Sequence, residues 1–526
     1  MKIVIVGAGV SGLSAGIFAL KAGYEVEIYE KNNVAGGCCS SWKRGDFTID
    51  NCIHWLTGTK KGTPQYNVWK ELGVIKDDEA FIQRESFYTS EYMGQKITLW
   101  RDLERTRKEL LELSPEDEKE ITRFIECVKL GEGLQNPTDD PAEKNSVFKE
   151  VTFSLSRAEI LKSLFVYSGI SIEEFTNKIK HPLIKKMAAD FMSKDYEALW
   201  LPMAYSFFVA GNGDIPKGGS KEIADRLVAT FKSLGGRLYL STPVKTVSIS
   251  DKKSKILKQI FVPSGKNFFK PKKIKVRSAD GVILENDSFV PADYIICACD
   301  IHYTYYHLLG KKYLSKPVSK AYANRKKNII YSSFQVAFAV DGEFREIDDT
   351  LYFDCDTIDV GMSKHNRLCV KNYRNYGDYI APAGKTVIQC SIIQYRKDSE
   401  FWIKLHENPT LYSNYKNNIA TAIKNRIETK FPQYEGKLKV LDIWTPYSYS
   451  SRNHCHMGAY MRFITKVINP RIIISSDVKK LSNVYLASHW LRYPGGLPTA
   501  ATMGKVAVDK IVLTEKTQCV SIFTTH

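Results

Sequence analysis

The first 30 residues constrain the fold of this chain more than any other stretch, because a glycine-rich turn there joins two strand-like segments. Residues 2–6 form a short apolar run that ends at glycine, which is typical of a buried strand. Residues 11–22 predict a helix closed by Gly23, and residues 25–30 predict a second strand. A strand, a crossover helix and another strand together predict two parallel strands of an α/β sheet.

The turn after the first strand has the sequence GAGVSG, from Gly7 to Gly12. Glycine at the first position permits a tight turn, at the third lets the backbone approach a pyrophosphate, and at the sixth lets the helix pack closely on the strand. The helix N-terminus then offers free N–H groups to the phosphates, and an acid at the end of the second strand accepts hydrogen bonds from ribose hydroxyls. We therefore expect a dinucleotide site formed by Gly7, Ala8, Gly9, Val10, Ser11, Gly12, Glu30 and Lys31.

A second glycine pair distinguishes between dinucleotides. Gly36-Gly37 follows Glu30 after five residues and precedes Cys38 and Cys39. With the first motif, this arrangement resembles the flavoprotein superfamily that holds amine oxidases, phytoene desaturases, carotenoid isomerases and retinol saturases. The resemblance implies FAD rather than NAD, and it places Gly36, Gly37 and Cys38 against the cofactor.

The segment after the glycine pair is most similar to the retinol saturase-like branch. The sequences GGCC and, from Asp50 to Trp55, DNCIHW look like that branch's GGCC and D-x-G-I-H-Y segments, except that Cys52 stands where glycine is usual. Cys52 and His54 are therefore our candidates for catalytic residues near the flavin. A thiol there would donate a proton, tune the flavin or form a covalent link to it. The alternatives stay open: Cys52 as a small buried side chain, and His54 as a group that orients a backbone carbonyl.

The far end of the chain carries a matching segment. Residues 483–490 predict a strand, and PGGLP leads into a helix expected over residues 499–512. In the superfamily, the last helix points its N-terminus at the pyrimidine edge of the flavin, where charge develops on reduction. Ser488 and Tyr493 replace two glycines of the usual pattern. The resemblance adds to the FAD-binding residues His489, Gly495, Gly496, Leu497 and Pro498.

The middle of the chain returns to the cofactor once more. The sequence IPKGGS at 215–220 resembles a family turn, a helix is expected over 221–234, and strands over 237–240, 244–249 and 291–298. The resemblance implies a backbone contact of Val244 with adenine, and Asp300 and His302 follow the last of these strands. We expect an α/β fold with a Rossmann-like FAD-binding domain from discontinuous segments and a mixed α+β substrate domain. The FAD-binding pieces are 1–71, 214–302 and 474–526, and the substrate pieces are 72–213 and 303–473.

The charge balance favours anionic partners. The chain has 75 basic and 58 acidic residues, which give a formal net charge of +17. Residues 252–277 are dense in lysine, and we expect them to form an enlarged β-hairpin. Two interpretations stay open: a solvated protrusion, or a foot on anionic lipid, where each basic residue near the surface adds about 1 kcal/mol.

The apolar runs and the cysteines of the sequence indicate the cellular compartment. No stretch reaches the roughly 18 apolar residues of a membrane span, and no segment resembles a cleaved leader. The 11 cysteines are scattered and include no CxxC, which indicates a reducing compartment and mostly free thiols. We expect a cytoplasmic protein, with peripheral membrane contact left open.

Several other classes lack support. His454 and His456 would share one face of a strand and meet one metal ion, but no second ligand cluster with zinc spacing appears, so we expect no metal. No nucleic-acid module, HExxH or GxSxG occurs. A second GxGxxG is also missing, so NAD(P)H as a reductant would have to dock transiently.

The resemblance implies chemistry at carbon–carbon double bonds. We expect an FAD-dependent oxidoreductase that saturates or desaturates an apolar isoprenoid or polyene by hydride transfer at flavin N5. Residues 200–208 and 444–449 are candidate walls of an apolar tunnel, or plain core. Three alternatives stay open: a reduced-flavin cis/trans isomerase of a polyene, a flavin amine oxidase, and a non-catalytic FAD-binding protein.

Overall fold

The computed structural model describes residues 1–77, 79–132, 166–262, 270–464 and 472–523 of the chain. For residues 251–262, 270–275 and 517–523 it describes the backbone alone. All statements below concern these described parts.

Five parallel strands from three distant parts of the chain form one sheet, in the order β19-β13-β1-β2-β9. Parallel pairing sets Ile3 opposite Tyr294 on one side and Val26 on the other. These strands are fully buried apolar runs for the most part, as expected of a parallel sheet covered by helices. The strands are β1 (Lys2–Val6), β2 (Glu25–Tyr29), β9 (Arg237–Tyr239), β13 (Tyr294–Cys297) and β19 (Val484–Leu486). The predicted α/β fold is confirmed.

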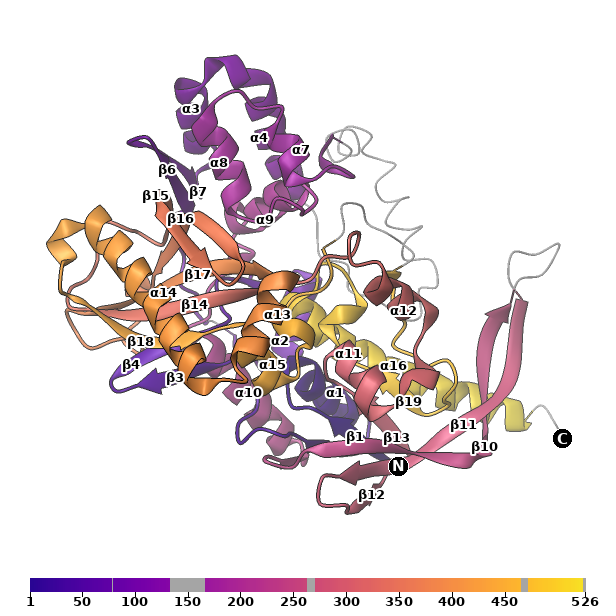
Figure 1. The fold of residues 1–526 in the computed structure, drawn as a ribbon. Coiled ribbons are helices and arrows are strands. Elements are labelled where there is room, and N and C mark those ends of the chain that lie inside the picture. Colours follow the sequence, from indigo (N-terminus) through magenta and orange to yellow (C-terminus); the bar gives the residue numbers. More distant parts are fainter. Residues whose placement is uncertain (78, 133–165, 263–269, 465–471, 524–526) are drawn as a thin grey trace.

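Three helices cover this sheet: α1 (Val10–Lys21), α10 (Gly219–Ser233) and α16 (Gly496–Phe523). Helix α1 starts directly above β1, because a Cβ on Gly12 would overlap the carbonyl oxygen of Gly7. Helix α16 lies against α1 (Figure 1), and a Cβ on Gly504 would lie 2.6 Å from the carbonyl oxygen of Ser11. Helix α16 begins three residues earlier than the sequence predicts, since Pro498 is compatible with a first helical turn.

A mixed sheet of seven strands forms the second layer, in the order β18-β14-β17-β16-β15-β6-β7. Its pairs are antiparallel except for β15 and β6. Helix α14 (Pro409–Lys430) runs along it in Figure 1 and buries Ile419, Ile423 and Ile427 in the same core as Phe334. The strands are β6 (Ser86–Tyr92), β7 (Gln95–Trp100), β14 (Tyr331–Val340), β15 (Thr350–Val360), β16 (Ser363–Asn372), β17 (Thr386–Tyr395) and β18 (Leu438–Trp444).

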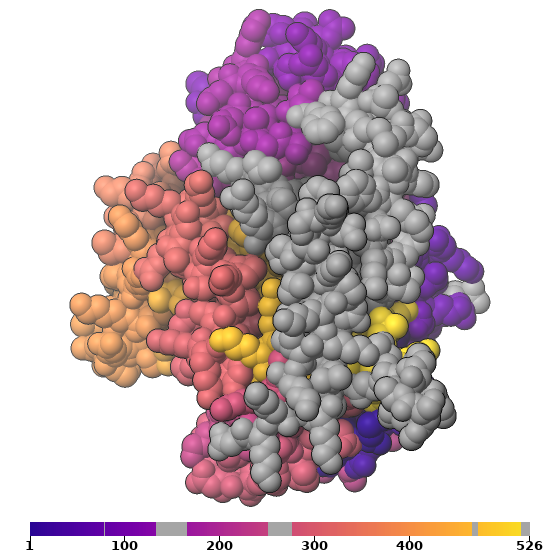
Figure 2. Space-filling model, turned by 90° about the vertical axis from the view of Figure 1, so that its right-hand side faces the viewer, coloured from indigo at the N-terminus to yellow at the C-terminus, as the bar shows by residue number. Residues whose placement is uncertain are grey.

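A group of helices forms one end of the molecule, seen at the top of both Figure 1 and Figure 2. Their apolar faces share a core with the edge strand β7 and its neighbour β6. The group consists of α3 (Leu103–Leu113), α4 (Glu118–Gly131), α7 (Ile172–Thr176), α8 (Pro182–Asp190) and α9 (Trp200–Val209). None of the described helices is long and apolar enough to span a membrane.

A long antiparallel hairpin projects from the body of the molecule (Figure 1). It consists of β10 (Val244–Val262) and β11 (Lys270–Leu284), with β12 (Phe289–Pro291) beside the base of β11. The backbone thus has the enlarged hairpin expected for residues 252–277. The tip at 263–269 and the side chains of 251–275 lie outside the described parts, so the lipid foot stays a prediction.

Short elements complete the described fold. Two small ladders pair β3 with β4 and β5 with β8. These elements are β3 (Ser41–Arg44), β4 (Phe47–Asp50), β5 (Leu56–Thr57), β8 (Gly213–Asp214), α2 (Pro64–Glu71), α11 (Ile301–Tyr303), α12 (Lys316–Ala323), α13 (Arg396–Leu405) and α15 (Pro446–Asn453).

Candidate active site

A cavity of about 720 Å³ is lined by both sheets and by the start of α16. It brings together residues from all three parts of the chain that the sequence assigns to the cofactor. Of the predicted site residues it is lined by Gly7, Gly9, Val10, Ser11, Glu30, Lys31, Gly36, Gly37, Cys38, Cys52, His54, Val244, His489, Gly495, Gly496, Leu497 and Pro498. Ala8 and Gly12 lie behind this surface and shape the turn instead.

The glycine turns form one end of the cavity. Gly36 N donates to the carbonyl of Ala8 at 2.8 Å, and a Cβ on Gly37 would lie 3.2 Å from the Cα of Gly9. Buried Glu30 accepts from Ala8 N at 2.8 Å through Oε2, and from Asn32 N at 2.9 Å and Asn32 Nδ2 at 2.8 Å through Oε1. A carboxylate has about four lone-pair sites. Glu30 therefore fixes the turn and retains capacity for one more donor, such as a ribose hydroxyl.

A different part of the cavity is formed by His489 and the start of α16. The ring atom Nδ1 of His489 is buried and has no hydrogen-bond partner among the described residues. A Cβ on Gly495 would lie 3.1 Å from this atom. Burial lowers the pKa of His489 to about 4, and the nearby charge of Arg462 acts in the same direction. A neutral imidazole with an unpartnered nitrogen, beside a helix N-terminus, fits a bound ring that carries hydrogen-bonding atoms.

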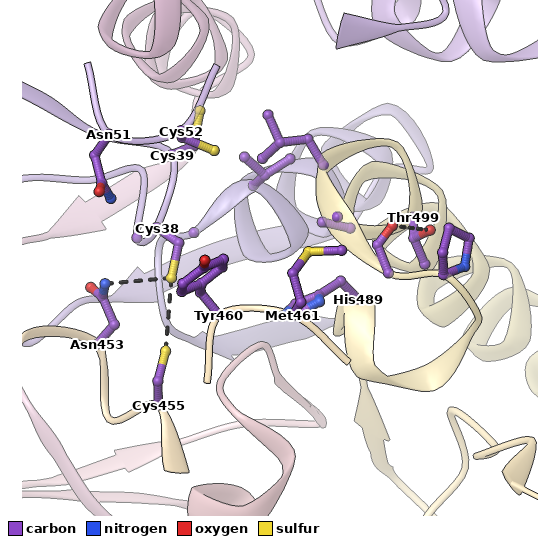
Figure 3. A pocket seen from close by; sticks show the side chains of 18 of the residues that line it. Cys38, Cys39, Asn51, Cys52, Asn453, Cys455, Tyr460, Met461, His489 and Thr499 are labelled. Carbon is purple, nitrogen blue, oxygen red and sulfur yellow. Dashed lines mark hydrogen bonds between the residues drawn. The ribbon is translucent and has the colours of Figure 1, made fainter. Parts of the chain in front are cut away.

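Six cysteines line the cavity: Cys38, Cys39, Cys52, Cys299, Cys369 and Cys455. Figure 3 shows Cys38 pointing toward both Cys455 and Asn453. The two sulfur atoms lie 3.8 Å apart, and Asn453 Nδ2 donates to Cys38 Sγ at 3.4 Å. The hydrogen bond from Cys455 lowers the pKa of Cys38, whereas the pKa of Cys455 is raised well above its usual value by the same bond and by burial. Of the two thiols, Cys38 is therefore the one that loses its proton more readily.

The structure places Cys52 beside Cys39 (Figure 3), half-buried at the wall of the cavity. Its hydrogen bond with Cys39, and then burial, raise the pKa of Cys52 well above its usual value. The Cys52 side chain is therefore a neutral thiol at neutral pH. This state is compatible with a proton donor and with a small filling group, and it excludes a resting thiolate nucleophile.

His54 contacts a buried lysine that sequence reasoning missed. Lys371 Nζ on β16 lies 3.1 Å from His54 Nδ1. Burial, and then the charge of Lys371, lower the pKa of His54 to about 3, so the imidazole is neutral. Burial also lowers the pKa of Lys371 to about 8. A mostly protonated ammonium thus donates to a neutral imidazole at the cavity wall.

Aromatic side chains also line the cavity. Trp200, Ala204 and Phe207 on α9 line the cavity, whereas Tyr205 and Phe208 on the other face of the helix pack in the helical core. One face of α9 therefore forms part of the cavity wall, and the other face is part of the core. Trp55 and Phe191 stack with ring centroids 5.6 Å apart, and both line the cavity. In the segment 444–449, only Tyr449 lines the cavity.

His454 and His456 would share one face on a strand, but the structure does not place them on one. Helix α15 ends at Asn453, His454 adopts a left-handed conformation with φ 53°, and a 3-10 turn follows. His454 stacks on Tyr303 at 4.1 Å between ring centroids, and His456 stacks on His302 at 3.8 Å. The two rings therefore have different partners.

Asp300 reaches the cavity, as expected for a residue at the carboxyl end of β13, and His302 is not among its lining residues. Burial raises the pKa of Asp300 to about 6.

Comparison with known proteins relates the chain to flavoproteins. The family model described as flavin containing amine oxidoreductase matches residues 10–512. All-trans-retinol 13,14-reductase of Danio rerio is 23% identical over 277 residues, which cover 49% of this chain and 44% of that protein. Phytoene desaturase of Phycomyces blakesleeanus is 24% identical over 318 residues, which cover 58% of this chain and 49% of that protein. The chain thus spans about half the length of these two relatives.

A solved structure extends the likeness to the whole fold. An oxidoreductase from Methanosarcina mazei matches with a TM-score of 0.62 and 18% identity, over 97% of this chain and 100% of that chain. The two proteins therefore share an overall fold.

Proposed function

The chain belongs to the flavin-containing amine oxidoreductase family, and from this premise we propose that it saturates or desaturates a carbon–carbon double bond of an apolar polyene or isoprenoid. FAD is its cofactor and its activity is that of an oxidoreductase, so the predictions of family, cofactor and enzyme class are confirmed. When bound, FAD supplies hydride transfer at N5.

The observation that carries this proposal is the aromatic wall that continues from the glycine turns within one cavity. An apolar substrate gains about 25 cal/mol for each Å² of apolar surface it buries, so such a wall supplies binding energy without specific hydrogen bonds. The names of the two relatives, a retinol reductase and a phytoene desaturase, support a polyene or isoprenoid over an amine. The aromatic rings would also exclude water from the reacting bond.

We assign the cofactor contacts to the residues that the sequence predicts. The backbone of Gly7, Gly9 and the start of α1 would hold the pyrophosphate, and Glu30 would accept from the ribose. Thr242 N donates to the carbonyl of Glu30 at 2.8 Å, so Val244, which lines the cavity two residues further, would contact adenine. The unpartnered Nδ1 of His489 and the N-terminus of α16 would face the pyrimidine edge of the flavin.

Cys52 and His54 remain our candidates for residues beside the reacting bond. Both line the cavity, on the segment between β4 and β5. Cys52 is a neutral thiol and would supply a proton when a double bond is saturated. His54 is neutral and would be oriented by the hydrogen bond that Lys371 Nζ donates to its Nδ1 at 3.1 Å.

The direct test is turnover. The purified protein should show the two visible absorption bands of bound flavin and should bleach when reduced anaerobically. All-trans-retinol and phytoene, each incubated with the reduced and the oxidised protein, should give products changed by two hydrogen atoms in mass spectrometry. NADH and NADPH should be compared with dithionite as reductants, since a transient nicotinamide donor is part of the proposal.

Other outcomes would replace the proposal. Products of unchanged mass but altered chromatographic retention would indicate a reduced-flavin isomerase. Hydrogen peroxide released with amines alone would indicate an amine oxidase. A bound flavin that no donor reduces would indicate a non-catalytic FAD-binding protein.

A further inference from the structure

Three basic side chains from distant segments line one part of the cavity: His54, Arg84 and Lys371. We call them the basic cluster. Arg84 and Lys371 are buried, with 7% and 5% of their surfaces exposed. Charged side chains are rarely buried to this extent unless they are paired, because their desolvation costs several kcal/mol for each ion. The hydrogen-bond and ion-pair partners of Lys371 and Arg84 therefore indicate whether the cluster is structural or binds a ligand.

Lys371 lacks an ion-pair partner among the described residues. None of their carboxylates lies within the 4.0 Å that defines an ion pair with Lys371 Nζ, and its hydrogen-bond partner is His54 Nδ1 at 3.1 Å. The rings of Tyr373 and Tyr376 lie 5.3 and 4.9 Å from the nitrogen and give weaker cation–π contacts. An ammonium has three donors. Two donors of Lys371 thus remain for a ligand in the cavity.

Arg84 is also incompletely paired. Its Nη1 donates to Asp349 Oδ1 at 2.9 Å, whereas its Nε and Nη2 have no hydrogen-bond partner among the described residues. The Arg84 guanidinium carbon lies 5.3 Å from the ring centre of Phe208. Arg84 therefore adds a second positive charge to the cluster with donors unused.

The carboxylates nearby are already engaged. Asp349 also accepts from Thr350 Oγ1 at 2.8 Å and from Tyr376 Oη at 3.3 Å. Asp50 accepts from Cys52 N at 3.0 Å, Ile53 N at 3.1 Å and Ser220 N at 2.8 Å, the last in the first turn of α10. Asp50 is thus held by backbone groups and leaves Lys371 without a hydrogen-bonded counter-charge. An anionic ligand oxygen would supply one.

We propose that the basic cluster binds the carboxylate of the substrate, with Lys371 as the direct donor and Arg84 as a second positive charge. The substrate is then a polyene or isoprenoid acid, whose apolar chain lies along the wall formed by Trp55, Phe191 and Phe207. This inference rests on the proposed function and narrows it, because a pure hydrocarbon would leave the buried ammonium without a hydrogen-bonded anionic partner.

The test compares three probes that share one polyene chain: all-trans-retinoic acid, its methyl ester and all-trans-retinol. Affinity for the FAD-loaded protein is measured by quenching of tryptophan fluorescence. A hydrogen bond to a charged group contributes about 1.5–3 kcal/mol, so the acid should bind about 10- to 100-fold more tightly than its methyl ester. Lys371→Met should remove this preference and leave the affinity for the ester unchanged. Lys364→Met, at an exposed position of the same strand, should change neither.

The pH dependence gives a second readout. Lys371 faces His54, Arg84, Asp349, Asp50 and Cys369, and its pKa is about 8. The affinity for retinoic acid should fall as pH rises through this value, because the ammonium loses its proton. The affinity for the methyl ester should stay constant. Lys371→Arg, which keeps the charge at all these pH values, should bind the acid with a flat pH profile.

The outcomes separate the two proposals. Equal affinities for acid, ester and alcohol would overturn the carboxylate site alone. Failure of all three to bind a protein with normal flavin absorbance would overturn the polyene function and the carboxylate site together. Loss of flavin from a folded Lys371→Met protein would show that the ammonium serves the cofactor, and this too would overturn the carboxylate site. If Lys371→Met does not fold, the unmodified protein and Lys371→Arg still test the proposal. In each protein, the preference for the acid over its methyl ester is then measured as a function of pH.

Discussion

Cys38 Sγ lies 3.8 Å from Cys455 Sγ, although 417 positions separate the two residues in the chain. The pair joins the segment after the Gly36-Gly37 turn to the loop after α15, at the wall of the cavity. Because the two thiols lie close together, formation of a disulfide between them tests this arrangement of the cavity wall.

Mild oxidation should join Cys38 and Cys455. A disulfide needs a sulfur separation of about 2.05 Å, so the atoms must approach by less than 2 Å. Because the pKa of Cys38 is lowered, its thiolate should also react first with iodoacetamide. Peptide mapping of the oxidised protein should find one linked pair that dithiothreitol reverses and Cys38→Ser abolishes. Equal labelling of Cys38 and the buried Cys390 on β17 would contradict this assignment.

Gly12→Ala should destabilise the protein and weaken FAD binding. The new Cβ would overlap the carbonyl of Gly7, so α1 would have to move away from the pyrophosphate turn. Overpacking of this kind costs about 1–3 kcal/mol. Urea unfolding and FAD titration of the apoprotein measure the two effects. Lys21→Ala, at an exposed position near the end of the same helix, is the control and should change the free energy of unfolding by less than about 0.5 kcal/mol.

Asp349→Ala should destabilise the protein strongly. The substitution leaves Arg84 buried without its carboxylate at 2.9 Å, and breaking a buried pair in this way costs about 3–5 kcal/mol. Asp348→Ala removes an exposed carboxylate from the adjacent position, 3.4 Å from Arg374, and should cost at most about 1 kcal/mol. Thermal melts of the two variants compare the sites. Similar melting temperatures would mean that the buried pair contributes no more than an exposed one.

The same carboxylate should make stability depend on pH. Burial raises the pKa of Asp349, but the positive charges of Arg84 and Lys371 outweigh it and hold the value below the ordinary one. The stabilisation is therefore complete above the ordinary carboxyl pKa of about 3.9 and is lost as pH falls through the lowered value. The difference in free energy of unfolding between the natural protein and Asp349→Ala should shrink as pH is lowered from 6 to 3. A constant difference would contradict the ionised state of Asp349.

Cys52→Ala should separate catalysis from cofactor binding. If the neutral thiol supplies the proton, turnover should fall about 10²- to 10⁴-fold, as for other general acids. Flavin content and the rate of reduction by dithionite should not change, because these do not need that proton. The matched control is Cys39→Ala, which removes the neighbouring thiol but keeps the donor. Unchanged turnover in Cys52→Ala would reduce Cys52 to a filling residue.

The parallel sheet could be predicted because its patterns are local. Strand β1 is an apolar stretch that ends at a glycine turn, β2 alternates acidic and apolar residues after Gly23, and α1 follows from the spacing of its glycines. No such local pattern predicted the left-handed conformation of His454 or the short turn that follows it. The helix predicted over residues 499–512 is shorter than α16, which extends through Phe523, because Gly496 to Pro498 resembled a loop.

The basic cluster could not be predicted because its partners are set by long-range pairing. Lys371 and His54 are 317 positions apart and meet only when the seven-stranded sheet packs against the segment after β4. The one local indication was a lysine inside an otherwise apolar strand end, LCVKN. The domain boundaries at residues 71, 213, 302 and 473, the lipid foot and the cytoplasmic location stay predictions.

The position of β19 has a consequence for biosynthesis. Strand β13 pairs with β1 on one side and with β19 on the other, and β19 and α16 follow every other part of the cavity in the chain. While the ribosome is still making the segment after β18, the outer edge of β13 is an unpaired template for intermolecular association. The complete FAD cavity would then form only after β19 and α16 have left the ribosome, and the exposed edge of β13 would need protection from association until that point.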